Sequence, residues 1–367
     1  MSDERAIKHR SVVAHLQEHR LGAVVLGRRC NFSWYTAGAR NYVGQACDVG
    51  NSWLVVDRSG ARVVTSNIEA PRLREEELAG SGIEVLQFDW HDAAGPAGAI
   101  ARVVGTARVA CDAPVAGLAA PPLGADFDRL RWVLCEQEID RYRRLCAETV
   151  EAVESVARGA KRNRTEFDLA GRLSAALLTR GCLPWTILVG GDERAEKFRH
   201  PLPTGQKIRH YFMLVVCAER GGLIANCTRL ASFGRAPAGL AGRHQAVVNV
   251  DAAMISATRV GATLADVFEQ AKAAYAAEGF ADQWRLHHQG GSCGYLPREV
   301  KAGPGVKTAI LADQAFAWNP SVPGTKSEDT ILCRKDGCKV LGASKDWPTI
   351  TGQWKDFSIP RPAILEL

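Results

Sequence analysis

The sequence predicts two domains, an α/β domain at residues 1–125 followed by an α+β domain at residues 126–367. A chain of this length is long enough for about two domains. The first part alternates short helical and strand patterns, whereas the second part shows two helices followed by strands, twice in succession. A segment rich in Pro, Gly and Ala at residues 112–127 separates the two patterns and is a candidate linker.

The N-terminal domain contains short elements in alternation. They are a helix at residues 5–20, an apolar run at 21–26 and strands at 52–56, 62–65, 84–88 and 109–111. Asp57-Arg58-Ser59-Gly60 lies between the first two of these strands and is typical of a turn. This layout predicts a sheet with helices packed against it.

The C-terminal domain begins with a long amphipathic segment at residues 136–157, whose apolar side chains recur at helical spacing. Thr165 is a candidate N-cap of a second helix that ends near residue 180, because Asp168 stands three residues later. The remaining elements are strands at 187–189, 211–217, 222–225 and 229–233, helices at 238–256 and 263–279, and strands at 286–288, 316–319, 329–332 and 338–341. Two similar α-α-β-β halves would generate this order.

Composition excludes several classes of protein. The hydrophobic share is 46% and the charged share 23%, as in soluble globular proteins. The sequence has no window of about 18 uncharged apolar residues that could span a membrane, and its N-terminus has no apolar signal core. We therefore expect a cytoplasmic protein with no membrane partner.

Charge and cysteine content argue against further classes of protein. The 46 basic and 40 acidic residues give a net charge of only +6, without a basic block that contains aromatics, which argues against a nucleic-acid partner. The 11 cysteines are scattered and form no CxxC pair, so we expect free thiols rather than a disulfide framework or a zinc knuckle.

Four short motifs in the second half carry residue types that do chemistry. They are His200-Pro201-Leu202-Pro203, Asn226-Cys227-Thr228-Arg229, the run from His287 to Tyr295 followed by Arg298-Glu299, and Ser327-Glu328-Asp329-Thr330. In this order they resemble the pita-bread superfamily of methionine aminopeptidase, prolidase, aminopeptidase P and creatinase, over about residues 130–345. Trp34-Tyr35-Thr36-Ala37-Gly38 is similar to the N-terminal domain of creatinase and prolidase. The resemblance implies a pita-bread C-terminal domain, in which helices cover a curved antiparallel sheet.

The metallopeptidases of that superfamily hold two metal ions with two Asp, one His and two Glu. Here Cys217 and Asn226 stand at the two Asp positions, and Gly291 stands at the His position. Glu299 and Glu328 match the two Glu ligands. The resemblance therefore implies a hydrolase with a degenerate metal site, and we expect neither a metal nor another cofactor.

Creatinase is a member of that superfamily that has the same fold and no metal, and the resemblance to it suggests the first functional hypothesis. It is a metal-independent, creatinase-like hydrolase that cleaves an amide- or amidine-type C–N bond of a small polar substrate. His200 would be the general acid/base, because an imidazole with a pKa near 6.5 can accept a proton from water and return it to a leaving nitrogen. Glu299 and Glu328 would hold and polarise the substrate.

Several further residues are candidates for substrate binding. His287 and His288 would point to opposite faces of a strand, and the resemblance favours His288 as the one that lines the pocket. Arg298 could clamp a substrate carboxylate, and Asn226 could hydrogen-bond a substrate carbonyl. Cys217 could face the pocket as well, although a buried structural cysteine is commoner than a nucleophile.

Arg40 and Tyr42 are candidates of a different kind, since they follow the Gly38 turn of the N-terminal domain. In creatinase, residues of that region reach the site of the partner subunit. The resemblance thus implies a homodimer that binds a small-molecule substrate.

Two alternatives remain open from the sequence. One is a metal-dependent Xaa-Pro aminopeptidase or prolidase, with an unusual site made from His200, Glu299, Glu328 and His288. The other is a repurposed member, which would be a lyase or isomerase of a biosynthetic pathway or a non-catalytic binding protein.

Overall fold

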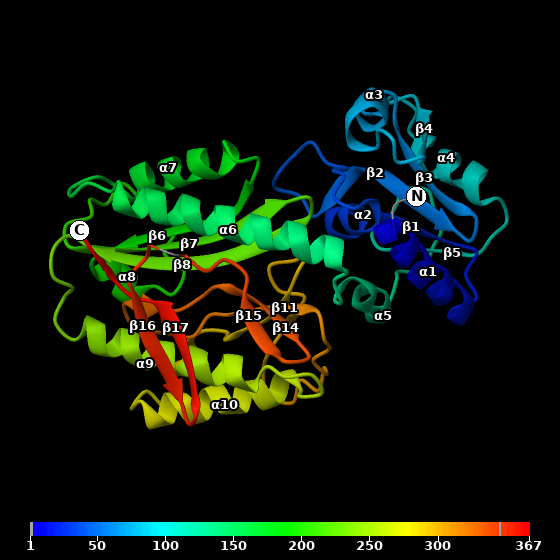
Figure 1. Ribbon diagram of the computed structural model, residues 1–367. Helices are drawn as coiled ribbons and strands as arrows, with labels where there is room; N and C mark the ends of the chain where they lie inside the picture. Colours follow the sequence, from blue (N-terminus) through cyan, green and yellow to red (C-terminus); the bar gives the residue numbers. More distant parts are fainter. Residues whose placement is uncertain (1–2, 345) are drawn as a thin grey trace. The chain divides into compact units, whose positions relative to one another are not determined.

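The computed structural model describes residues 3–344 and 346–367, which form two compact units, Met1–Arg131 and Trp132–Leu367 (Figure 1). The first unit is α/β and the second is α+β with mainly antiparallel sheets, in agreement with the predicted fold class. The domain boundary between residues 125 and 126 remains a prediction. No helix among the described residues combines the length and the apolar character that crossing a membrane requires.

A five-stranded mixed sheet in the order β4-β3-β2-β1-β5 forms the centre of the first unit. Its strands are β1 (Ala23–Arg28), β2 (Val49–Asp57), β3 (Gly60–Ser66), β4 (Glu84–Phe88) and β5 (Val109–Cys111). Asp57 makes the predicted turn between β2 and β3, because its Oδ1 accepts hydrogen bonds from the backbone N–H groups of Ser59 at 2.7 Å and Gly60 at 3.0 Å.

Helices cover this sheet. They are α1 (Asp3–Glu18), α2 (Arg29–Thr36), α3 (Ala70–Arg72) with the π-helical turn Leu73–Glu77, α4 (Gly95–Val104), and α5 (Ala125–Asp128) with the 3₁₀ turn Arg129–Arg131. The predicted linker at residues 112–127 belongs instead to this unit, because Ala113, Val115 and Phe127 are buried and anchor it to the core. Its Pro, Gly and Ala content reflects a packed irregular segment, in which small residues and turns allow close approach of the chain.

The second unit is built on the four-stranded sheet β18-β8-β7-β6. Its strands are β6 (Leu183–Gly191), β7 (Tyr211–Arg220), β8 (Leu223–Ser232) and β18 (Leu365–Glu366). β7 and β8 form a hairpin with Gly221 and Gly222 at its tip, both at positive φ, as a tight hairpin turn requires. Every residue of β8 is buried, although its centre carries the polar Asn226, Thr228 and Arg229. Because of this polar interruption, the sequence analysis wrongly divided β8 into two strands.

A second sheet of this unit has the strand order β10-β9-β11-β14-β15 and lies next to the first. Its strands are β9 (Gly290–Cys293), β10 (Val300–Lys301), β11 (Gln314–Trp318), β14 (Thr330–Arg334) and β15 (Gly337–Val340). Cys227 of β8 bridges to Asp329, and the N–H of Thr228 donates to the carbonyl of Glu328 at 3.0 Å. The two sheets therefore meet where the second and fourth sequence motifs lie.

The strand predicted at residues 286–288 is absent from the structure. Leu286 ends a 3₁₀ turn that begins at Gln283, and β9 starts only at Gly290. A Cβ at Gly290 would lie 2.1 Å from the carbonyl oxygen of Ala317, and one at Gly291 would lie 1.9 Å from that of Val300. Only glycines allow this approach of three backbones, so the strand begins at the glycine pair rather than at the histidines.

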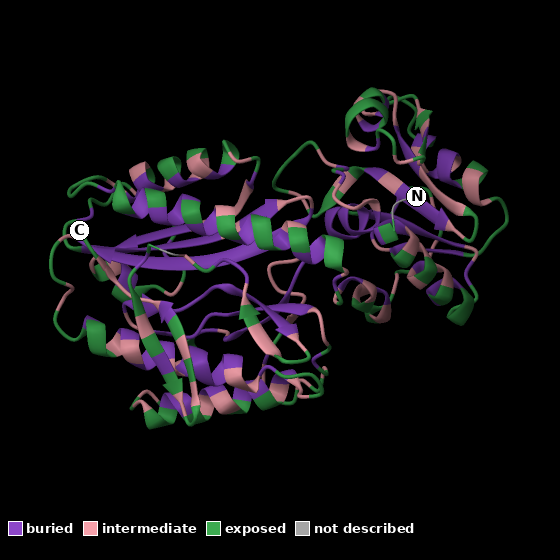
Figure 2. Cartoon of the chain, in the orientation of Figure 1, coloured by how far each residue is buried: buried purple, intermediate pink, exposed green. Residues whose placement is uncertain are grey.

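Helices α6 (Glu136–Arg158) and α7 (Glu166–Leu178) pack on β8 and β6, respectively (Figure 1). Thr165 caps α7 as predicted, since its hydroxyl accepts from the N–H of Asp168 at 3.1 Å. Helices α9 (Leu240–Ala257) and α10 (Leu264–Ala277) pack against each other. Figure 2 shows the buried stripe of α9 between exposed turns. The remaining elements are α8 (Glu193–Lys197) and the hairpins β12–β13 (Ser321–Val322, Thr325–Lys326) and β16–β17 (Thr349–Trp354, Phe357–Pro362).

His244 on α9 links three elements and provides a test of this packing. Its Nε2–H donates to the carbonyl of Pro362 at 2.8 Å, and its Nδ1 lies 2.6 Å from the hydroxyl of Thr325. Burial lowers the pKa of His244 to about 4.

The unfolded chain takes up a proton near pH 6.5 that folded His244 does not bind. Stability from this residue is therefore complete above pH 6.5 and is lost as the pH falls toward 4. We expect the wild-type free energy of unfolding to fall by about 2 kcal/mol more between pH 7 and pH 5 than that of His244→Gln. Urea unfolding at both pH values measures this, and identical pH dependence in the two proteins would contradict it.

Candidate active site

A cavity of about 380 Å³ in the second unit collects most of the chemistry-bearing residues. Its polar lining consists of Thr186, His200, Cys217, His288, Arg298, Lys301, Asn319, Lys326 and Glu328. Cavities of this size commonly hold small molecules. Five of the residues predicted from the sequence therefore lie together: His200, Cys217, His288, Arg298 and Glu328.

Glu328 is the only carboxylate among these lining residues, and both of its oxygens are engaged. Arg298 Nη2 donates to Oε1 at 2.7 Å, Lys326 Nζ lies 2.8 Å from Oε2, and the hydroxyl of Thr228 donates to Oε2 at 2.8 Å. Burial alone would raise the pKa of Glu328, but Lys326 and Arg298 outweigh it and lower that pKa to about 2. Glu328 is therefore ionised at neutral pH.

Arg298 is held in place from two sides. Besides Glu328, its Nη1 donates to the Oδ1 of Asn226 at 2.9 Å and to the carbonyl of Pro297 at 2.6 Å. Its Nε is buried without a hydrogen-bond partner among the described residues. Asn226 thus positions the guanidinium.

Cys217 and Asn226 face each other across β7 and β8, in direct register. The thiol of Cys217 donates to Asn226 Oδ1 at 3.2 Å. Burial raises the pKa of this thiol to about 11, and Glu328 adds to the effect. Cys217 is consequently a protonated donor at neutral pH rather than a thiolate nucleophile.

Three imidazoles meet at one side of the cavity. His200 Nε2 lies 3.1 Å from His287 Nε2, and His287 Nδ1 lies 2.9 Å from the hydroxyl of Ser321. Burial and Lys326 lower the pKa of His200, and burial lowers that of His287 to about 2 and that of His288 to about 4. All three are therefore neutral at pH 7. His287 and His288 precede β9, so the alternation of side chains along a strand does not apply to them. Both rings therefore approach His200, although only His288 lines the cavity.

Sequence reasoning missed four of the nine polar lining residues: Thr186, Lys301, Asn319 and Lys326. Asn319 is almost fully buried at the end of β11, and its Oδ1 has no hydrogen-bond partner among the described residues. Lys301 lies on the short strand β10, next to Val300. The signal for Asn319 was a polar residue that ends an apolar strand, directly before Pro320.

Four predicted site residues are not among those that line this cavity: Asn226, Glu299, Arg40 and Tyr42. Glu299 precedes β10, where its N–H donates to the carbonyl of Ser292, and it is not among the lining residues. Arg40 and Tyr42 belong to the first unit, where Arg40 pairs with Glu77 at 2.7 Å and the guanidinium of Arg29 lies over the Tyr42 ring. Their predicted roles are not tested by these contacts.

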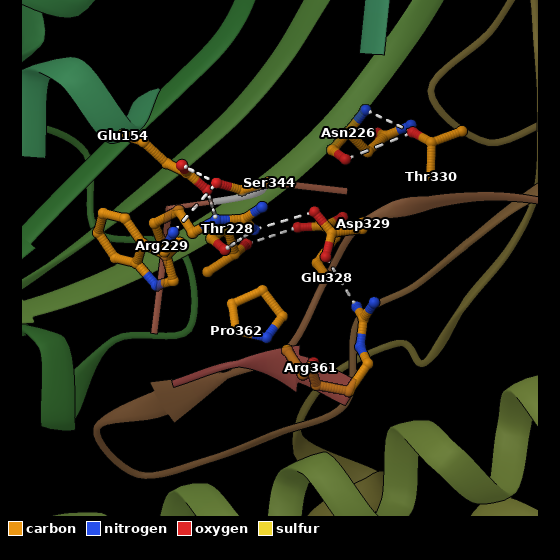
Figure 3. Close-up of polar contacts among 12 residues, drawn as sticks. Glu154, Asn226, Thr228, Arg229, Glu328, Asp329, Thr330, Ser344, Arg361 and Pro362 are labelled. Carbon is orange, nitrogen blue, oxygen red and sulfur yellow. Dashed lines mark hydrogen bonds and ion pairs between the residues drawn. The ribbon is translucent and has the colours of Figure 1, made fainter. Parts of the chain in front are cut away.

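A buried ionic network fixes the segment that carries Glu328 (Figure 3). Arg229 lies between Glu154 at 2.8 Å and Asp329 at 2.9 Å. Arg361 contacts Asp329 at 3.0 Å and Asp251 at 2.7 Å. The network joins α6, β8, α9 and β17 to the residue that follows Glu328, so it sets the position of that carboxylate.

Comparison with known proteins places the chain in a family. The sequence matches metallopeptidase family M24 over residues 140–335, which is more than half of the chain. The chain belongs to metallopeptidase family M24. It is 26% identical over 310 residues to the protein named "Probable dipeptidase PepE" of Mycobacterium tuberculosis, covering 77% of this chain and 81% of that protein.

Solved structures of M24 relatives share the fold. Dipeptidase PepE from Mycobacterium ulcerans superposes with a TM-score of 0.74 at 21% identity, covering 93% of this chain and 96% of that one. The prolidase from Pyrococcus horikoshii superposes with a TM-score of 0.78 at 16% identity, covering 92% and 98%. The predicted superfamily, the pita-bread fold and the hydrolase class are confirmed.

The comparisons contradict the metal-independent, creatinase-like function expected from the sequence. M24 is a family of metallopeptidases, and the relatives are named as dipeptidases and a prolidase. They favour the alternative of a metal-dependent Xaa-Pro aminopeptidase or prolidase. The prediction rested on residues such as Cys217 and Asn226, which replace metal ligands of the family. Such replacements show which ligand side chains are lost, but they do not show which reaction the chain catalyses, so they could not support a creatinase-like function.

The residues of this M24 chain do not fit the family's centre of two metal ions. Cys217 and Asn226 are neutral and bonded to each other, Glu299 is not among the lining residues, and Glu328 is already paired with two cations. Two divalent ions would meet the positive charges of Arg298 and Lys326 at close range. The three imidazoles are the remaining nitrogen donors, and one donor atom of each lies within 4.8 Å of the others. Without bridging carboxylates they suit at most a single ion, not the family's pair. No catalytic step is therefore derived through a metal.

Proposed function

We propose that this chain is a dipeptidase-type hydrolase, which cleaves the amide bond of a small substrate that carries a free carboxylate. The observation that carries the proposal is the charge of the cavity. Arg298, Lys301 and Lys326 face a single carboxylate, Glu328. The dipeptidase names of the relatives support the same substrate class.

The excess of positive charge favours an anionic ligand. Arg298 and Lys326 are each within 2.8 Å of Glu328, whereas Lys301 is exposed at the cavity. A substrate carboxylate would offset this excess and could take a hydrogen bond from the unpartnered Nε of Arg298. The unpartnered Oδ1 of Asn319 is an acceptor that suits a substrate ammonium or amide N–H.

His200 is the residue that suits proton transfer. It is neutral at pH 7, because burial and Lys326 lower its pKa. A neutral imidazole accepts a proton from the attacking water and returns it to the leaving amide nitrogen. Contact with His287 at 3.1 Å holds the ring, and the nearby cations would stabilise the negative charge that develops on the carbonyl oxygen.

Dipeptides with and without a free carboxylate test the proposal. We expect hydrolysis of free dipeptides, with kcat/KM about 10- to 200-fold lower for the matching C-terminal amides, because a charge-assisted contact contributes about 1.5–3 kcal/mol. The assay includes added Mn²⁺, Co²⁺ and Zn²⁺, since M24 is a metallopeptidase family.

Lys301→Met should reduce the preference for the free carboxylate, whereas Lys307→Met, outside the cavity lining, should leave it unchanged. Equal turnover of free and amidated dipeptides, or no turnover of either, would overturn the proposal.

Three further expectations belong to the proposal. They are a homodimer, to which Arg40 and Tyr42 would contribute across subunits, a cytoplasmic location, and the absence of a nucleic-acid partner. Light scattering after size-exclusion chromatography tests the dimer, and a monomer would remove the proposed roles of Arg40 and Tyr42.

A further inference from the structure

A second group of metal-ligating side chains lies in the first unit, outside the cavity. His15 and His19 stand four residues apart on α1, and Asp126 on α5 faces both. One donor atom from each lies within 4.8 Å of the others. Two histidines at this spacing project from the same face of a helix.

The donor atoms are spaced nearly as the ligands of one metal ion would be. Asp126 Oδ2 lies 3.4 Å from His15 Nδ1 and 2.7 Å from His19 Nε2. Ligands of a tetrahedral zinc ion, each at about 2.0–2.1 Å, lie about 3.3 Å apart. His15 already has this separation from Asp126, and His19, whose side chain is 41% exposed, is free to move by the remaining half ångström or so.

Asp126 Oδ2 is an orphaned acceptor. The Oδ2 atom itself is buried, and its 2.7 Å contact with His19 Nε2 does not have hydrogen-bond geometry, so it has no hydrogen-bond partner among the described residues. A Cβ at position 124 would lie only 2.3 Å from Asp126 Oδ1, so Gly124 leaves the space that this carboxylate occupies. The carboxylate is thus held beside two imidazoles without satisfying its own bonding capacity.

The histidine rings are held by packing as well. The His15 ring is buried, with an edge contact to Phe127 at 5.1 Å and the His19 ring at 4.2 Å. Such fixed orientation lowers the entropy cost of binding. Asp126 is 44% exposed, so water can complete the coordination shell.

We propose that His15, His19 and Asp126 form a binding site for a single transition-metal ion, which links α1 to α5. Two imidazoles and one carboxylate suit Zn²⁺, Co²⁺ or Ni²⁺ rather than Mg²⁺ or Ca²⁺, which take oxygen ligands. The site is separate from the proposed active site and does not depend on the proposed hydrolysis.

Metal titration of the untagged full chain tests the site. After treatment with a chelator, the chain is titrated with Zn²⁺ by calorimetry and with Co²⁺ by visible absorption. We expect one equivalent to be lost, or its affinity to fall at least about 100-fold, in His19→Ala and in Asp126→Asn, since even outer partners of a metal contribute 10- to 100-fold. Zn²⁺ should raise the melting temperature of the wild type but not of these variants.

Matched variants identify where the metal binds. His288→Gln alters the imidazole group of the cavity, and His210→Ala removes an exposed histidine that belongs to neither group. Both should keep the equivalent that His19→Ala loses. Absence of Zn²⁺ and Co²⁺ uptake would overturn the proposal, and so would uptake that His19→Ala leaves unchanged. Because these readouts do not involve activity, failure of the dipeptidase assay would leave the site standing.

Discussion

Replacing His200 with alanine is expected to lower kcat/KM for a dipeptide by about 10²- to 10⁴-fold, the usual contribution of a positioned acid or base. The neutral imidazole lines the same cavity as the cations that would bind the substrate carboxylate. Loss of its ring removes the group that would take a proton from water. Because His200 is at the edge of the cavity rather than in the core, the variant should fold, as circular dichroism and thermal unfolding would show.

His210→Ala is the matched control for this experiment. His210 is exposed and lies outside the cavity lining, so its removal should change kcat/KM less than about twofold. Activity of His200→Ala within tenfold of the wild type would contradict the assigned proton transfer. A KM effect alone, with kcat unchanged, would indicate that His200 only binds substrate.

Replacing Arg361 with methionine is expected to lower the free energy of unfolding by about 3–5 kcal/mol, the cost of breaking a buried ion pair. Arg361 is 1% exposed and contacts both Asp251 and Asp329. Its loss leaves two buried carboxylates with fewer partners, although Ser327 still donates to Asp251 and Arg229 still contacts Asp329. Denaturant unfolding measures the change.

An exposed arginine provides the comparison. Arg243 pairs with Glu196 at 2.7 Å, but both side chains reach solvent, at 27% and 47% exposure. Arg243→Met should therefore reduce stability by no more than about 1 kcal/mol. If Arg361→Met were equally mild, the buried network would not be what holds the segment of Glu328 in place.

The sequence was informative wherever periodicity and local chemistry agree. The long helix α6, the cap at Thr165 and the strands at Tyr211–Arg220 follow from apolar spacing and capping residues. The hairpin β16–β17 was missed, because Gln353, Lys355 and Arg361 interrupt its apolar pattern. Arg361 looks like a surface residue in the sequence, and only tertiary contacts with Asp251 and Asp329 make its burial favourable.

The candidate site likewise contains residues that the motifs predicted and residues that only the fold brings together. The motifs predicted that His200, Arg298 and Glu328 lie together, and the structure places all three at one cavity. Lys301 could not be recognised, since a single Lys carries no signal until β10 brings it to the cavity, and Asn319 offered only the weak signal of a polar residue after an apolar strand. Glu299 stands beside Arg298 in sequence but does not line the cavity with it.

The most direct test of this account is a crystal structure of the chain grown with a dipeptide and Mn²⁺, with anomalous scattering recorded for manganese. We expect the substrate carboxylate next to Arg298 or Lys301, and Glu328 still paired with Arg298 and Lys326, with no manganese peak on Glu328. Two manganese peaks about 3.5–4 Å apart, bridged by Glu328, would contradict the account.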